Sequence, residues 1–341
     1  MAVKYFKYDK PFRLENGEVI HGLTVAYHTF GKRKSSGNNV VWVCHALTAN
    51  SDVADWWPHT VEEGKFLDPA KYFTVCANVL GSHYGTTGPL ETDPETGAPY
   101  YDSFPFITVR DMVRAHQLLA EALGIRKVRA LVGSSIGGFQ ALEWAIMQPH
   151  FAERLILIAT AARSQPWTIA FNESQRMAIE TDETFGEKDP EAGKKGMRVS
   201  RSIGLLSYRG SSAYNATQQE NDTQYKLVGF RATTYQQYQG EKLCRRFNAY
   251  SYYRLSQAFD SHNVGRFRGG IESALATIRA RTLVVGISSD IILPVSEQIF
   301  LYRHIPEAEL FLINSEFGHD GFLVEHEKLN RLLKPFIETP L

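Results

Sequence analysis

A serine near the middle of the chain has the surroundings of a catalytic nucleophile. Gly133-Ser-Ser-Ile-Gly137 fits the pattern G-x-S-x-G, in which a sharp strand-to-helix turn displays the middle serine, here Ser135. Glycines two residues away on either side leave room for such a turn. The helix that follows points its amide end at the same spot, which favours negative charge there. Taken alone, the pentapeptide also fits an ordinary glycine- and serine-containing loop.

Two later residues could supply the partners that this serine needs. A serine hydroxyl is a weak nucleophile at neutral pH, so it requires a base, and the base requires an orienting acid. Asp290 comes soon after the apolar run Arg281–Gly286, and His319 lies in a glycine-flanked loop. In sheets of this type the acid and then the histidine follow later strands. The order Ser135, Asp290, His319 therefore predicts a catalytic triad, although singly the latter two could be a helix cap and a surface histidine.

An acyl-transfer intermediate also needs two amide donors for its oxyanion. One is expected from Ile136, directly after the nucleophile, and the other from Leu47 in the loop His45-Ala-Leu-Thr48. His45 could act as a second base, but we interpret it as a structural histidine that holds this loop. Cys44 before it is interpreted as a core residue rather than a reactive thiol.

A repeated pattern of apolar runs and helical segments must position these residues. Buried strands are predicted at Val40–Cys44 and Tyr72–Leu80, and further strands at Val128–Val132, Arg154–Ala159, Arg281–Gly286 and Glu309–Asn314. Helices are predicted over Val109–Leu123 and Ile136–Ile146, and a β-hairpin within Phe12–Tyr27. Strands that read as continuous apolar runs and alternate with helices indicate an α/β fold, with a mostly parallel sheet covered by helices on both faces.

Residues 163–270 interrupt this pattern, because they contain no convincing buried strand. Helical segments are expected at Arg198–Tyr208 and Glu241–Phe259. We expect a helical lid insertion over the carboxyl edge of the sheet, where open α/β proteins place their sites; a separate interaction domain is the alternative. The predicted division is a core of residues 1–162 and 271–341 with the lid between them. Four basic residues are expected to be solvated surface: Arg245, Arg246, Arg266 and Arg268.

Composition excludes several other classes of protein. The 341 residues include 37 Lys and Arg and 37 Asp and Glu, so no global positive field attracts nucleic acid or an anionic membrane. Cys44, Cys76 and Cys244 are widely spaced, which suggests neither a disulfide framework nor a metal site. Free thiols, a start without a signal-peptide core, and apolar runs well short of the roughly 20 residues of a membrane span favour the cytoplasm.

With these residues assembled, the sequence resembles the homoserine O-acetyltransferase family of α/β-hydrolase-fold acyltransferases over almost its full length. The motifs that carry the resemblance are His45–Thr48, Asn78–Gly81, Tyr84–Pro89, Thr108–Val113, Gly133–Trp144, Tyr238–Lys242, Arg246–Tyr250 and Gly318–Phe322. One such motif would be weak, whereas the ordered series is highly specific. The resemblance implies an α/β-hydrolase fold and maps the family's triad onto Ser135, Asp290 and His319.

The resemblance also implies a set of substrate contacts. The family uses an arginine and a tyrosine seven residues apart in the lid, which match Arg201 and Tyr208, and the aspartate after the histidine, which matches Asp320. A guanidinium can hold an α-carboxylate in a forked pair, and a carboxylate can hold an α-ammonium group. A surface ion pair for Arg201 and a turn role for Asp320 are the alternatives.

Two positions depart from the family pattern. The turn reads Gly-Ser-Ser-Ile-Gly-Gly where the family usually has Gly-Gly-Ser-Met-Gly-Gly, and Ala49-Asn50 follows Thr48 where a glycine is usual. Ile136 still contributes its amide, so the first change would reshape the acyl pocket and preserve the chemistry. Both changes bear on which acyl group is carried.

The activity implied is O-acylation of L-homoserine from acetyl-CoA as co-substrate, by a ping-pong route that feeds methionine synthesis. The resemblance further implies no permanently bound cofactor or metal, and a homodimer formed through the lid. Succinyl-CoA as donor, L-serine as acceptor, hydrolysis by a serine hydrolase of the same fold, and a non-catalytic interaction protein are the alternatives. The charges of Arg201 and Asp320 favour a transferase, because a simple esterase has no need to bind a zwitterion.

Overall fold

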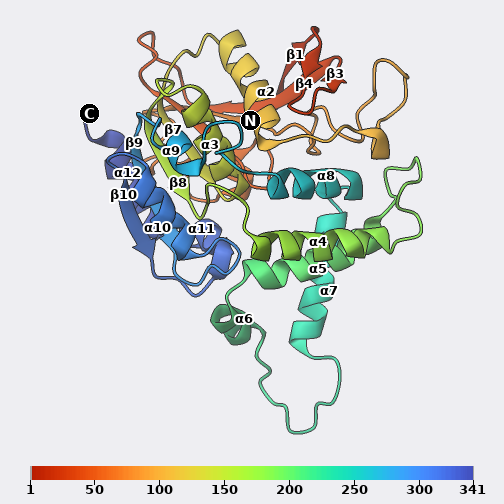
Figure 1. Cartoon of the computed structure of the whole chain (residues 1–341). Coiled ribbons are helices and arrows are strands. Elements are labelled where there is room, and N and C mark those ends of the chain that lie inside the picture. Colours follow the sequence, from red (N-terminus) through yellow and green to blue (C-terminus); the bar gives the residue numbers. More distant parts are fainter. Residues whose placement is uncertain (1, 341) are drawn as a thin grey trace.

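The computed structural model describes residues 2–340 and contains an eight-stranded sheet covered by helices (Figure 1). In spatial order the strands are β1 (Lys4–Tyr8), β4 (Leu23–Phe30), β6 (Phe73–Ala77), β5 (Val40–Cys44), β7 (Val128–Ser134), β8 (Ala152–Ile158), β9 (Arg281–Ile287) and β10 (Glu309–Ile313). The pairs β1–β4 and β4–β6 are antiparallel, and each remaining neighbouring pair is parallel. The carboxyl ends of the parallel strands therefore meet at one edge.

The sheet has an apolar core on each face, as the central strand β5 illustrates. Trp42 packs into one core and Val41 and Val43 into the other, because successive side chains of a strand point to opposite faces. The core on the Trp42 side includes side chains of α2 (Val109–Ala122), α3 (Ile136–Met147) and α10 (Val295–His304), together with side chains from the helices between β8 and β9. The core on the opposite side includes side chains of α1 (Val53–Trp56), α11 (Gly321–Val324) and α12 (His326–Glu338). The predicted layering is confirmed.

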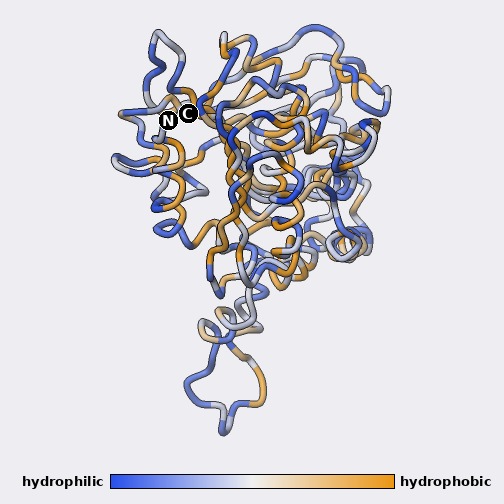
Figure 2. The backbone as a smooth tube through the Cα atoms, turned by 60° about the vertical axis from the view of Figure 1, so that its left-hand side comes forward, coloured by the Kyte–Doolittle hydropathy of each residue, from blue (hydrophilic) through white to orange (hydrophobic). Residues whose placement is uncertain are grey.

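The chain between β8 and β9 is helical. Its elements are α4 (Pro166–Glu180), α5 (Lys194–Tyr208), α6 (Ser211–Gln218), α7 (Arg231–Cys244), α8 (Ala249–Asp260) and the short α9 (Ile271–Leu275). This segment leaves the sheet region and returns to it at one place, where Arg163 and Asn263 form an antiparallel bridge. Helices α4 and α5 lie side by side, and α7 with the loop before it extends away from the body of the protein (Figures 1 and 2).

Most predicted elements are confirmed to within a few residues, but one helix is not. The hairpin turn near Gly17 forms, with β2 (Phe12–Arg13) pairing antiparallel to β3 (Val19–Ile20). The single helix predicted over Glu241–Phe259 is wrong, because α7 ends at Cys244 and α8 begins at Ala249. Asn248 caps α8 by accepting a hydrogen bond from the Ser251 amide, a role for which asparagine is favoured over helix-interior positions.

The expectation of solvated charges is wrong for Arg266 and Arg268. Arg266 forms an ion pair with Glu15, and Arg268 forms one with Glu143, whose side chain is only 3% exposed. Arg110 of α2 contacts both carboxylates at 2.7 Å. This charge network joins the N-terminal hairpin, α2, α3 and the segment after α8.

Three further observations concern features that composition raised. Cys44, Cys76 and Cys244 all carry free thiols. Within residues 2–340, no helix combines the length and the apolar character that crossing a membrane requires. In the same part of the chain, no cluster of three or more His, Cys, Asp or Glu side chains is arranged to hold a metal ion.

Candidate active site

Ser135 stands between β7 and α3 in a strained backbone conformation. Its φ of 55° and ψ of −129° lie in a region that residues other than glycine rarely adopt. Such strain persists only where the surroundings impose it, and it concentrates at functional sites. Here the Ser135 amide donates to the Ile158 carbonyl at 3.0 Å, and the Ser135 carbonyl accepts from the Thr160 hydroxyl at 2.9 Å.

The glycines flanking this turn are required by close backbone contacts. A Cβ on Gly133 would lie 2.1 Å from the Gly137 carbonyl oxygen. A Cβ on Gly137 would lie equally close, at 2.1 Å, to the carbonyl oxygen of Cys44. The second contact presses the start of α3 against the loop that follows β5, so the two predicted sources of oxyanion donors meet.

The three residues of the predicted triad lie in one hydrogen-bonded chain. His319 Nε2 is 2.8 Å from Ser135 Oγ, and His319 Nδ1 is 2.6 Å from Asp290 Oδ2. Asp290 Oδ1 accepts from the amides of Ile292 and Leu293, each at 2.9 Å. All three side chains are buried. The loops after β7, β9 and β10 thus bring together the residues that the sequence singled out.

The charge environment of His319 suits a general base. Burial alone would lower the pKa of His319, but the charge and hydrogen bond of Asp290 outweigh it, so the pKa is raised above its ordinary value. A neutral imidazole that donates Nδ1–H to Asp290 leaves Nε2 to accept the Ser135 hydroxyl proton. This is the arrangement that activates a serine for attack on an acyl group.

Serines that sequence analysis missed join the acid loop to the histidine loop. Ser289 Oγ donates to the Ser315 carbonyl at 2.6 Å and accepts from the Gly318 amide at 2.9 Å. Ser288 Oγ accepts from the Ser315 amide at 3.0 Å. The sequence signal for these contacts was the pair of serines directly before Asp290, since short hydroxyl side chains often bond to nearby backbone groups.

Leu47 and Ile136, the predicted oxyanion donors, belong to two segments that adjoin Ser135. Ile136 is the first residue of α3, and the first amides of a helix have no acceptor within it. Leu47 lines the cavity that contains Ser135, and its side chain belongs to the same apolar cluster as that of Ile136. Gln140 of α3 donates to the His45 carbonyl at 3.3 Å and ties the two segments together.

His45 has the structural environment that we expected for it. The ring is fully buried, Nδ1 is 2.8 Å from the Ala46 carbonyl, and Nε2 accepts from the Val79 amide at 3.1 Å. Burial lowers the pKa of His45 to about 4. Both ring nitrogens therefore bond to backbone groups, one within this loop and the other in the segment after β6.

A cavity of about 570 Å³ contains Ser135 and lies between the carboxyl edge of the sheet and the helices of residues 163–270. Its wall on the lid side is formed by Asn172, Arg201, Tyr208, Lys242, Arg246 and Phe259. Ala49 and Asn50 line it on the sheet side, whereas Ile136 packs behind it in a cluster with Phe259 and Ile292. Both departures from the family pattern thus adjoin this cavity.

Arg201, Tyr208 and Asp320 line the same cavity as His319. The Arg201 guanidinium carbon lies 5.5 Å from the centre of the Tyr208 ring, which is 6.1 Å from the centre of the His319 ring. Asp320 follows His319 in a short turn, η2 (Gly318–Asp320), and forms an ion pair with Arg209 at 3.0 Å. The Arg209 contact was not anticipated.

Arg246, which was expected to be solvated, also contributes to the cavity. Its guanidinium donates to the Thr48 carbonyl and hydroxyl and, at 2.9 Å, to the Tyr84 hydroxyl. Thr48 follows Leu47, so Arg246 joins residues 163–270 to the loop that carries a predicted oxyanion donor. Tyr252 is a second unanticipated neighbour, because its hydroxyl donates to Gln175 Oε1 at 2.5 Å and acts electrostatically on Tyr208.

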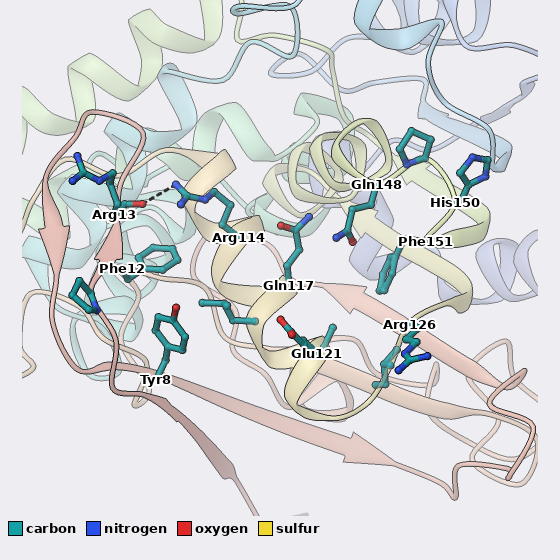
Figure 3. A pocket seen from close by; sticks show the side chains of 15 residues that line it. Tyr8, Phe12, Arg13, Arg114, Gln117, Glu121, Arg126, Gln148, His150 and Phe151 are labelled. Atoms are coloured by element: carbon teal, nitrogen blue, oxygen red, sulfur yellow. Dashed lines mark hydrogen bonds between the residues drawn. The ribbon is translucent and has the colours of Figure 1, made fainter.

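A separate hollow of about 730 Å³ lies at the opposite edge of the sheet (Figure 3). Its walls include Tyr8, Phe12, Gln117 and Gln148, and they hold none of the triad. Residues that immediately precede β7 and β8 line it, which places it at the amino ends of those strands. The hydrogen bond drawn there joins Arg114 to the Arg13 carbonyl at 2.7 Å. We therefore place the chemistry in the Ser135 cavity.

Known proteins resemble this chain in sequence and in structure. The sequence matches the alpha/beta hydrolase fold family over residues 39–326. It is 43% identical over 336 residues to the homoserine O-acetyltransferase of Cyclobacterium marinum, covering 98% of this chain and 95% of that protein.

Two solved structures have the same fold. The homoserine O-acetyltransferase from Bacillus anthracis has a TM-score of 0.92 at 23% identity, covering 99% of this chain and 98% of that one. Esterase E22 has a TM-score of 0.89 at 23% identity, covering 99% and 100%. At this identity the likeness concerns the fold, which transferases and esterases share, whereas the sequence relative specifies the family. The chain belongs to the homoserine O-acetyltransferase family and has the alpha/beta hydrolase fold.

Proposed function

We propose that the protein transfers the acetyl group of acetyl-CoA to the γ-hydroxyl of L-homoserine, as a step of methionine synthesis in the cytoplasm. The observation that carries the proposal is the hydrogen-bonded chain of Ser135, His319 and Asp290, in a cavity that also presents Arg201 and Asp320. Family membership supports homoserine as the acceptor.

In the first half-reaction, Ser135 attacks the thioester. His319 Nε2 takes the hydroxyl proton as Ser135 Oγ bonds to the thioester carbonyl carbon. The amides of Leu47 and Ile136 stabilise the oxyanion that develops. The C–S bond then breaks, the CoA thiolate takes the proton from His319, and an acetyl ester of Ser135 remains.

In the second half-reaction, the same histidine activates the acceptor. Arg201 binds the α-carboxylate of homoserine, Tyr208 lies beneath that guanidinium, and Asp320 binds the α-ammonium group. His319 removes the γ-hydroxyl proton as the oxygen attacks the acetyl carbon, and it returns that proton to Ser135 as the ester bond breaks. Over both half-reactions, the acetyl group moves from the sulfur of CoA to the γ-oxygen of homoserine, and CoA leaves as the free thiol.

Residues 163–270 act in this proposal as a lid that keeps water from the acetyl-enzyme, since transfer requires that hydrolysis be slow. Support comes from the cavity wall, which these residues share with the carboxyl edge of the sheet.

We also propose that the chain forms a homodimer through this segment. Tyr225, Leu227 and Val228 lie in the loop between α6 and α7 and are strongly exposed. The loop extends from the body of the protein in two views (Figures 1 and 2). A cluster of exposed apolar side chains marks an interaction surface, which a second copy would cover. Sedimentation velocity of the purified chain measures the stoichiometry.

A competition experiment tests the proposed reaction. Purified protein is given L-homoserine with equal concentrations of acetyl-CoA and succinyl-CoA, and the product is identified by mass spectrometry. We expect O-acetyl-L-homoserine, no product from the Ser135→Ala variant, and much less product when L-serine replaces homoserine. Hydrolysis of acetyl-CoA that is no slower without homoserine than with it, and without any O-acyl product, would establish a hydrolase instead.

A further inference from the structure

The end of α5 supplies a charged partner to the residue that follows the catalytic histidine. Arg209 Nε lies 3.0 Å from Asp320 Oδ2. The Arg209 side chain is 29% exposed and that of Asp320 is 15% exposed, so solvent screens this pair less than a surface pair. Arg209 comes directly after Tyr208, and Asp320 comes directly after His319. The ion pair therefore joins the lid to the histidine loop beside two residues of the site.

Backbone packing fixes the point from which Arg209 reaches Asp320. A Cβ on Gly210 would lie 2.0 Å from the carbonyl oxygen of Glu316. A Cβ on Gly318 would lie 2.5 Å from the Gly210 amide nitrogen. The segment after Tyr208 thus rests on the histidine loop backbone to backbone, which leaves little freedom for the ion pair to shift.

Several charges act on the Asp320 carboxylate. Arg201 and Arg209 approach it from α5, His319 from its own turn, and Asp290 from the loop after β9. Burial raises the pKa of Asp320, and among the opposing effects that of Arg209 is the largest. The carboxyl group would be protonated more readily without Arg209, and a protonated carboxyl group binds an ammonium ion poorly.

We propose that Arg209 is a positioning residue for the amino-acid acceptor. Its guanidinium holds Asp320 through Oδ2 and leaves Oδ1 to accept from the α-ammonium group. The site then selects an acceptor that carries both an ammonium and a carboxylate group. This inference rests on the proposed function, because it assigns a role within the acceptor site.

The Arg209→Gln variant tests this role by separating the two half-reactions. Release of CoA in the first turnover reports acylation of Ser135, and the homoserine dependence of steady-state turnover gives KM. We expect the homoserine KM to rise about 10- to 100-fold, because the carboxylate that binds the α-ammonium group loses its ion-pair partner, with first-turnover CoA release within about twofold of wild type. The Arg209→Lys variant retains the charge without the planar fork and should have an intermediate KM.

The pH dependence distinguishes this role from a merely structural one. The pKa of Asp320 should be higher in Arg209→Gln, so the carboxylate fraction should decline sooner as the pH falls. The KM defect should therefore be largest at low pH and shrink as the pH rises. A pH-independent defect would contradict the proposal.

A double variant and a matched control complete the design. Because Arg209 acts through Asp320, adding Arg209→Gln to Asp320→Asn should raise KM no further, whereas independent residues give additive losses. Arg198 is the control, since it also lies on α5 and pairs with Glu241, but its side chain is 53% exposed. Arg198→Gln should leave KM unchanged.

The outcomes separate the two proposals. Wild-type protein that acylates no amino acid would overturn the proposed function together with the role of Arg209. Wild-type turnover with an unchanged homoserine KM in Arg209→Gln, additive losses in the double variant, or equal KM values for the Lys and Gln variants would overturn the role of Arg209 alone.

Discussion

At the scale of single residues, the contact between Asp290 and His319 determines the protonation state in which the histidine works. The carboxylate accepts Nδ1–H at 2.6 Å, so a neutral ring presents Nε2 to Ser135. It also outweighs the effect of burial and raises the pKa of His319. Because the base must be neutral, acylation should be lost as the pH falls through a value above the ordinary 6.5.

The Asp290→Asn variant should change both the rate and its pH dependence. Losing the charge lowers the pKa of His319, so the acid limb of first-turnover CoA release should move to lower pH. An asparagine also favours the wrong tautomer, and the maximal rate should fall about 10³- to 10⁴-fold. Asp9→Asn, in the exposed segment after β1, is the control and should match wild type. An acid limb that stays in place or moves upward would show that Asp290 does not set this pKa.

At the scale of elements, the chemistry depends on how closely the start of α3 approaches the loop after β5. Gly137 makes this approach possible, because a Cβ there would collide with the Cys44 carbonyl oxygen at 2.1 Å. The Cβ is attached directly to the backbone and the oxygen is part of it, so neither atom can rotate away as the end of a long side chain can.

Gly137→Ala should therefore separate the two segments that carry the proposed oxyanion donors. We expect a loss of about 1–3 kcal/mol in the free energy of unfolding from overpacking. First-turnover CoA release should slow by about 10²-fold or more, the effect of losing one oxyanion donor. Gly97→Ala is the control, because φ there is +72° but no atom lies within 4 Å of the added Cβ. It should cost stability alone, about 1–2 kcal/mol. An acylation rate that is unchanged in Gly137→Ala would show that catalysis does not depend on this contact.

At the scale of the whole molecule, the network of Glu15, Glu143, Arg110, Arg266 and Arg268 ties together parts that are distant in the chain. Burial would raise the pKa of Glu143, but Arg268 and Arg110 lower it by more. A carboxyl group with a lowered pKa in the folded state stabilises the protein above its unfolded pKa. This contribution is lost as the pH falls through the folded value, below 4.5.

Glu143→Gln should destabilise the fold at neutral pH by about 3–5 kcal/mol, because two arginines lose a buried partner. Urea titration at several pH values would measure the loss, which should shrink once the pH falls below the ordinary glutamate pKa of 4.5. Glu309→Gln breaks an ion pair whose glutamate is 51% exposed and should cost about 0–1 kcal/mol. Equal losses in the two variants, or a loss independent of pH, would be inconsistent with a stabilising role for the network.

The sheet and the three residues of the predicted triad could be predicted from the sequence. Ser135, Asp290 and His319 each follow an apolar run, and the carboxyl ends of parallel strands meet at one edge of a sheet. A local pattern could therefore predict that these three distant residues lie close together, because the topology of such sheets brings the strand ends together. The family resemblance added Arg201, Tyr208 and Asp320, which lie around the same cavity.

The partners of the charged residues and the break between α7 and α8 depend on the tertiary structure and could not be predicted from the sequence pattern. Arg209, Arg266 and Arg268 look alike in the sequence, yet one contacts Asp320 and the others contact glutamates of the N-terminal hairpin and α3. Hydrophobic periodicity reports which face of an element is buried, but not which charge lies opposite a given side chain. That choice follows from where residues 163–270 rest on the sheet, a contact that no local pattern in this sequence encodes.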